Sequence, residues 1–171
     1  MSNSAMRVLG GGRICDMLTI VTILALISLA GVASGALASP TQKLIGAWSG
    51  RGTAVFEGNR SERVKCNAYY TGKARKINIA VRCASASYKI EIRSKLTNQA
   101  GRLSGTWEER TFNATGDTKG SINDDGLRLT VRGGGLTASM RIDFENAGQN
   151  IFIKTQGVQL KSVRIALSKS N

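Results

Sequence analysis

Histidine is absent from the 171-residue chain, and this absence removes most routes to catalysis. Histidine is the commonest general base, and both Ser–His and Cys–His nucleophile pairs need it. Two adjacent acidic pairs remain, Glu108–Glu109 and Asp124–Asp125. Neighbouring residues on a strand face opposite ways, so neither pair can act together as a glycosidase couple. We therefore predict no catalytic residues and a protein that is not an enzyme.

Ligands for a metal or a cofactor are equally scarce. The chain has three cysteines and no histidine, and a pair of thiolates alone makes a poor zinc site. The run Asp124-Asp125-Gly126 lacks the further acidic ligands of a calcium loop and is typical of a hairpin turn. The triple glycine at 133–135 is not followed by Lys-Ser/Thr, so it predicts a flexible turn rather than a phosphate-binding loop. We predict no metal site and no cofactor.

Proline occurs once, and no window of the sequence shows sustained helical periodicity. Short apolar/polar alternations recur instead, joined by Gly, Asn and Asp turns, which predicts an all-β fold. Nearly every link is of hairpin length, which favours an up-and-down meander, and closing such a meander removes its exposed edges. We predict a single antiparallel up-and-down β-barrel of about 8–10 strands over residues 39–171.

The one long hydrophobic run, Met17–Ala33, lies close to the N-terminus. Two arginines precede it, and Ala36-Leu37-Ala38 follows it with the form of a signal-peptidase site. We predict that residues 1–38 are a signal peptide cleaved near Ala38, so that the mature protein is periplasmic or secreted. An uncleaved anchor is the alternative, because a run of this length is near the lower limit for spanning a bilayer.

The stretch Arg63–Ser85 has the clearest pattern in the chain. Apolar residues fall at every second place on both sides of a turn at 71–76, which predicts a β-hairpin with one apolar face. The register that sets Cys66 opposite Cys83 also sets the apolar residues of the two strands opposite one another. Cleavage removes the third cysteine, and an even pair in an exported domain favours a disulfide. We predict a Cys66–Cys83 disulfide that stabilises the fold by on the order of 3 kcal/mol.

Residues Leu44–Gly52 read L-I-G-A-W-S-G-R-G. A G-x-W on the first strand of an exported all-β chain resembles the calycin superfamily, and the longer motif looks like the opening of nitrobindin-type barrels. Lipocalins set a basic residue of the last strand over this tryptophan, so the resemblance implies that Trp48 closes one barrel end with Arg164 stacked on it. The rest of the chain is similar to small exported proteins of alphaproteobacteria. Nitrobindins bind haem through a histidine, which this chain lacks, so haem binding is not expected.

A formal net charge of +13 at pH 7 predicts attraction to anionic material. Basic residues alternate with the apolar residues of the hairpin and of the segment after it, so they share one predicted outer face. They are Arg63, Lys65, Lys73, Arg75, Lys76, Arg82, Lys89, Arg93 and Lys95. We predict that this basic patch binds an anionic polymer or a membrane surface, with nucleic acid not expected in vivo. A solvated face without a partner is the alternative.

Large side chains on the predicted inward face suit either a ligand pocket or a filled core. The candidates for a pocket are Trp48, Tyr70, Tyr88, Trp107, Met140 and Phe144. We therefore predict a non-enzymatic exported binding protein that holds a lipid or other apolar small molecule in the barrel, or an anionic envelope component on its basic face. A protein-interaction module, such as a periplasmic protease inhibitor, is the alternative function. The sequence leaves the oligomeric state open.

Overall fold

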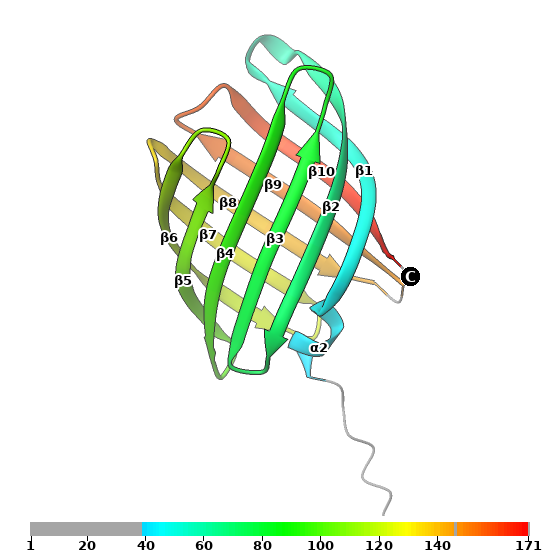
Figure 1. The fold of residues 1–171 in the computed structure, drawn as a ribbon, viewed down its shortest axis with the longest axis vertical. Helices are drawn as coiled ribbons and strands as arrows, with labels where there is room; N and C mark the ends of the chain where they lie inside the picture. The colour runs from blue at the N-terminus through cyan, green and yellow to red at the C-terminus, as the bar shows by residue number, and fades with distance from the viewer. Residues whose placement is uncertain (1–38, 146, 171) are drawn as a thin grey trace, which may run out of the picture. The chain divides into compact units, whose positions relative to one another are not determined.

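The computed structural model describes residues 39–145 and 147–170 (Figure 1). The predicted signal peptide, residues 1–38, lies outside the described residues. Within these residues, one short helix and one 3₁₀ turn accompany ten strands. In chain order they are α2 (Pro40–Leu44), β1 (Gly46–Phe56), η1 (Glu57–Asn59), β2 (Ser61–Lys73), β3 (Lys76–Ala84), β4 (Lys89–Gln99), β5 (Arg102–Glu109), β6 (Ala114–Asn123), β7 (Gly126–Gly133), β8 (Leu136–Phe144), β9 (Gly148–Gln156) and β10 (Leu160–Lys169). The predicted all-β class is confirmed.

The ten strands form one closed antiparallel barrel. Each strand pairs with its neighbours in the chain, and β1 pairs with β10 to complete the ring, so the predicted up-and-down meander is confirmed. In Figure 1, β2, β3 and β4 cross in front of β8, β9 and β10, so these two groups of strands form opposite walls. Because successive side chains on a strand point to opposite sides, each strand sends half of its residues inward and half outward.

Two glycines allow β10 to lie against β1. A Cβ atom added at Gly50 would lie 1.9 Å from the backbone oxygen of Ala166, and one added at Gly52 would lie 2.0 Å from that of Arg164. A side chain at either position would therefore push the two strands apart. The glycine-rich motif that opens the barrel sequence thus has a structural reason, which is close approach of the backbones at the closing ladder.

The chain before β1 differs from the prediction. The Leu44–Gly52 motif is assigned to the first strand by its resemblance, but Leu44 ends the helix α2, and β1 begins at Gly46. Pro40 lies at the start of α2, where its missing N–H costs no hydrogen bond and its fixed φ suits a helix. Leu44 is fully buried, and its carbonyl oxygen accepts a 2.9 Å hydrogen bond from the indole nitrogen of Trp48. The helix and Trp48 therefore close one end of the barrel together.

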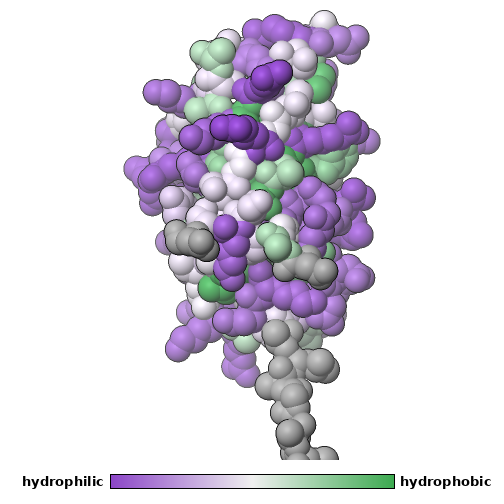
Figure 2. Space-filling model, turned by 90° about the vertical axis from the view of Figure 1, so that its right-hand side faces the viewer, coloured by the Kyte–Doolittle hydropathy of each residue, from purple (hydrophilic) through white to green (hydrophobic). Residues whose placement is uncertain are grey.

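Inward-facing apolar side chains fill a contiguous core. Its buried members are Leu44, Trp48, Ala54, Phe56, Val64, Cys66, Ala68, Tyr70, Ile77, Ile79, Leu96, Leu103, Ile122, Leu127, Leu129, Ile142, Ile151, Val163, Ile165 and Leu167. The outer surface has the opposite character, and Figure 2 shows hydrophilic side chains over most of the face that it displays. Within the described residues, no helix is both long enough and apolar enough to cross a membrane.

The hairpin of β2 and β3 has the predicted register. Cys66 pairs with Cys83 across the ladder, and the two residues form a disulfide with their Cα atoms 4.2 Å apart. Cys66 is fully buried, which places the bond on the core face of the hairpin. The predicted disulfide and the predicted inward face are both confirmed.

Removing this cross-link should lower stability without changing the fold. We expect the double variant C66A/C83A to lose on the order of 3 kcal/mol in free energy of unfolding, because the unfolded chain regains the entropy of the open loop. Urea denaturation followed by tryptophan fluorescence measures the loss, and a reductant should destabilise the wild-type protein while leaving the variant unchanged. Equal stability of the two proteins would contradict a structural role for the disulfide.

Candidate functional site

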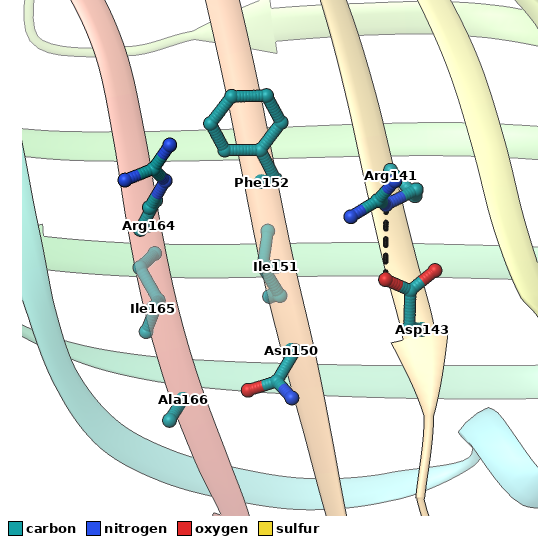
Figure 3. A pocket seen from close by; sticks show the side chains of 8 residues that line it. All are labelled: Arg141, Asp143, Asn150, Ile151, Phe152, Arg164, Ile165 and Ala166. Atoms are coloured by element: carbon teal, nitrogen blue, oxygen red, sulfur yellow. Dashed lines mark ion pairs between the residues drawn. The ribbon is translucent and has the colours of Figure 1, made fainter.

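An aromatic side chain stands on the outer wall of the barrel between basic residues. Phe152 faces outward from β9, opposite Arg141 on β8 and Arg164 on β10 (Figure 3). Arg164 Cζ lies 5.1 Å from the centre of the Phe152 ring, and Lys154 Nζ lies 5.6 Å from it. Both distances are in the range of cation–π attraction. The ring is half-buried, because its neighbours cover part of it while solvent reaches the rest.

The surface around Phe152 is hollowed on both sides. A groove of about 360 Å³ crosses β8, β9 and β10, lined by Arg141, Asp143, Asn150, Ile151, Phe152, Arg164, Ile165 and Ala166. A second hollow of about 340 Å³ adjoins it over β6 to β9, lined by Gly120, Ser121, Arg128, Leu129, Thr130, Ser139, Met140, Arg141 and Phe152. The two share Arg141 and Phe152, and we call them together the Phe152 groove. Figure 3 shows Phe152, Arg141 and Arg164 on the near side of their strands, while Ile151 and Ile165 point away.

Cations extend from the Phe152 groove across several strands. Cross-strand pairing joins Arg128, Arg141, Phe152, Arg164, Thr53 and Arg63 into one outward row over β7, β8, β9, β10, β1 and β2. Neighbouring strands lie about 4.8 Å apart, so this row spans about 24 Å around the barrel. Arg141 Nε also contacts Asp143 Oδ2 at 2.9 Å, which partly neutralises that position. The row is therefore a band of positive charge with an aromatic ring in it.

The predicted basic patch lies mainly on the wall opposite β9 and is partly neutralised by one acid. Glu91 lies within 3.3 Å of Arg82, 2.8 Å of Arg93 and 3.6 Å of Arg110. The hydrogen bond from Arg93, together with Arg82, holds the pKa of the Glu91 carboxyl below its usual value. The other patch members make no ion pair within the described residues: Arg63, Lys65, Lys73, Arg75, Lys76, Lys89 and Lys95. Arg63 joins this patch to the row of the Phe152 groove.

The six predicted pocket residues all face the interior. Trp48 and Tyr70 belong to the buried core, and Tyr88, Met140 and Phe144 pack against it. The indole nitrogen of Trp107 donates to the backbone oxygen of Arg132 at 3.2 Å. That these side chains hold a ligand stays a prediction.

Several interior polar groups lack partners. The hydroxyls of Tyr70 and Thr118 and both polar atoms of the Gln149 amide are buried without a hydrogen bond within residues 39–145 and 147–170. Burying an unpaired polar group costs free energy, so such groups normally meet water or a ligand. The interior therefore has polar binding capacity that the chain itself does not use.

Trp48 and Arg164 are predicted to close one barrel end together, and the prediction is wrong for Arg164. Arg164 faces outward and stacks on Phe152, because it is an odd number of residues from the inward Ile165 and Leu167. The cation over Trp48 is Lys169, which pairs with Trp48 across β1 and β10 and places its Nζ 5.6 Å from the indole ring. A basic residue of the last strand does cover the tryptophan, but five positions further along the chain.

Phe152 is missing from the sequence-based site, although the sequence contains a signal for it. It lies between Ile151 and Ile153 and shares its side of the strand with Lys154, so an aromatic side chain occupies a position expected to be polar. Its neighbours Arg141 and Arg164 could not be assigned from this local pattern, since they depend on the registers of three strands.

Glu109 serves the structure rather than a ligand. It is inward and only 7% exposed, and its carboxylate accepts backbone N–H bonds from Phe112 at 2.6 Å and from Glu91 and Thr111 at 3.0 Å. Desolvation raises the pKa of this carboxyl, but the backbone donors outweigh it, so the pKa lies below its usual value. No three His, Cys, Asp or Glu residues gather for a metal in the part of the chain that the structure describes.

No family model and no curated protein sequence matches the chain. Among solved structures, the barrel is similar to that of the S-type phycobiliprotein lyase CPES from Guillardia theta, with a TM-score of 0.54. The match has 14% sequence identity and covers 77% of this chain and 90% of the lyase chain. At this identity the similarity shows the fold alone.

The Glu109 hydrogen bonds should make stability depend on pH. A carboxyl with a depressed folded-state pKa contributes stability above its unfolded value of about 4.3, and the contribution is lost as pH falls through the folded-state value. We expect E109Q to be less stable than wild type by about 1–3 kcal/mol at neutral pH, with the difference shrinking in acid. Denaturant unfolding of both proteins from pH 7 to pH 3 measures this difference. A gap that stays constant over that range would contradict the role assigned to the charge.

Proposed function

We propose that this protein is a non-enzymatic binding protein that holds an acidic polysaccharide on its outer wall, at the Phe152 groove. The observation that carries the proposal is the half-buried outward Phe152 with Arg164 and Lys154 against its ring and Arg141 beside it. An aromatic ring offers a flat apolar surface on which the C–H face of a sugar can pack. Arginine binds carboxylates through two parallel hydrogen bonds.

The arrangement of the cations suits a linear polymer rather than a single small anion. Arg128, Arg141, Arg164 and Arg63 lie in one row across the strands, with Phe152 between the second and the third. Arg141 and Arg164 are two strands apart, which is about 10 Å. An extended chain that carries regularly spaced carboxylates can therefore contact several arginines while one sugar packs on the ring. The net charge of +13 adds long-range attraction.

The compartment that we propose is the cell envelope or the exterior. The predicted signal peptide supports export, and the Cys66–Cys83 disulfide fits an oxidising environment. Acidic polysaccharides are abundant in such places. The carboxylate in the groove, Asp143, is engaged by Arg141, so the groove has no free acid–base pair for hydrolysis, which supports binding without catalysis.

Retention of a small molecule inside the barrel is a second candidate function. Its support is the set of buried polar groups without partners on Tyr70, Thr118 and Gln149, together with the fold similarity to a phycobiliprotein lyase. The molecule would be apolar overall, to suit the core, with a polar group for the amide or a hydroxyl. The two candidates differ in ligand position, since one contacts interior side chains and the other contacts Phe152.

Binding to polygalacturonate tests the outer-wall proposal. We expect the wild-type protein to bind this polymer in a salt-dependent way, and R141Q/R164Q to bind about tenfold or more weakly, because hydrogen bonds to charged groups are worth about 1.5–3 kcal/mol each. F152S should weaken binding without changing the charge. The matched control is K89Q/K95Q, which removes two charges from β4 on the opposite wall and should have a much smaller effect.

Any of four results would overturn this assignment. Equal losses in the two double variants would mean that net charge alone drives binding. Binding that salt does not weaken, or no binding at all, would exclude an electrostatic site. Tighter binding of single-stranded DNA than of polygalacturonate would assign the groove to a different polymer. Neutral dextran serves as the negative control for the sugar backbone.

A further inference from the structure

Phe112 is the most exposed large apolar side chain of the described residues, with 65% of its surface open to solvent. It lies in the loop that joins β5 to β6, at the end of the barrel opposite α2. Exposed phenylalanine is unfavourable in water, and no core contact compensates for it here. The β6 residues of the Phe152 groove, Gly120 and Ser121, lie near the other end of that strand, so Phe112 calls for a separate explanation.

The backbone of this loop is held so that Phe112 stays outside. The Glu109 carboxylate accepts the N–H groups of Phe112 and Thr111, and the same carboxylate is bonded to the N–H of Glu91 on β4. The N–H of Arg110 donates to the backbone oxygen of Glu91 at 2.9 Å. These bonds tie the loop to the neighbouring strand. The side chain is therefore presented on a fixed support rather than on a free segment.

Cations flank the loop on both sides. Arg110 is part of it, Lys89 opens the adjacent strand β4, and Arg132 lies near the end of β7 on the other side. Three acids lie nearby: Glu91 contacts Arg110 at 3.6 Å, Asp117 pairs with Arg132 across β6 and β7, and Glu108 lies on β5. The next turns toward each side, 85–87 and 134–135, carry no charge at all. We call Lys89, Arg110, Phe112 and Arg132 the Phe112 corner.

We infer that the Phe112 corner docks the protein on an anionic lipid bilayer, with the Phe112 ring inserted among the lipids. One apolar side chain is too little for the buried centre of a stable protein–protein interface, which covers more than 1,000 Å² in general. A single aromatic ring with cations beside it suits the bilayer interface, where the ring enters the apolar region and the cations are attracted to anionic headgroups. The attachment is weak and reversible because it rests on one ring and a few charges.

The fluorescence of the variant F112W reports directly whether this side chain inserts into the bilayer. We expect F112W, in the protein produced from its full-length coding sequence, to shift its emission to shorter wavelength on vesicles of phosphatidylglycerol and phosphatidylcholine. Lipids brominated on their acyl chains should quench this emission. The matched control is F152W on the outer wall, which should show neither effect. Both variants change an exposed or half-exposed ring, so both should fold, and circular dichroism checks that they do.

Vesicle co-sedimentation completes the test. F112S should bind anionic vesicles about tenfold more weakly than wild type, since burial of a phenylalanine side chain is lost. The inference is overturned if F112W emission does not change on anionic vesicles, if F152W responds instead, if F112S binds as well as wild type, or if neutral vesicles bind equally. Polygalacturonate binding by F112S should stay at the wild-type level, which separates this corner from the Phe152 groove.

Discussion

The pairing of β1 with β10 is the constraint on which the rest of this structure depends. It turns a ten-strand meander with two exposed edges into a ring, and it does so only because Gly50 and Gly52 leave room for the carbonyl groups of the closing strand. Closure separates an apolar interior from a basic exterior, since every strand then divides its residues between the two. It also makes the outward row continuous, because Thr53 on β1 links Arg164 on β10 to Arg63 on β2.

Much of the fold can be predicted from the sequence, because strand alternation and hairpin-length links are local sequence patterns. Alternation around Cys66 and Cys83 determines strand type, inward face and register of one hairpin, and hairpin-length links determine the order of strands. The remaining features depend on distant contacts. The α2 helix places Leu44 in the core, where its carbonyl oxygen accepts the indole N–H of Trp48. Lys169, and not Arg164, lies over Trp48 because the β1–β10 register pairs Lys169 with Trp48. This register cannot be predicted from a local sequence pattern. Phe152 is an aromatic residue at a position expected to be polar, but its arginine neighbours come from two other strands.

Charge on the outer wall is organised differently on the two sides of the barrel. Around β4, Glu91 contacts Arg82, Arg93 and Arg110 and partly neutralises them. Around β9, Arg141 contacts Asp143. Arg164 and Lys154 lie against the Phe152 ring instead. The hollows that adjoin Phe152 are also on this side. One wall thus has a carboxylate among its arginines, while on the other wall the cations lie beside an aromatic ring and two hollows.

We propose that this barrel binds an acidic polysaccharide on its outer wall, and nuclear magnetic resonance tests this proposal most directly against binding in the interior. In a titration of ¹⁵N-labelled protein with oligogalacturonate, the backbone amide signals of Arg141, Phe152 and Arg164 should move in proportion to binding. The indole signals of Trp48 and Trp107 and the side-chain amide of Gln149 report the interior, and they should stay in place. Movement of these interior signals with unchanged signals around Phe152 would contradict the proposal.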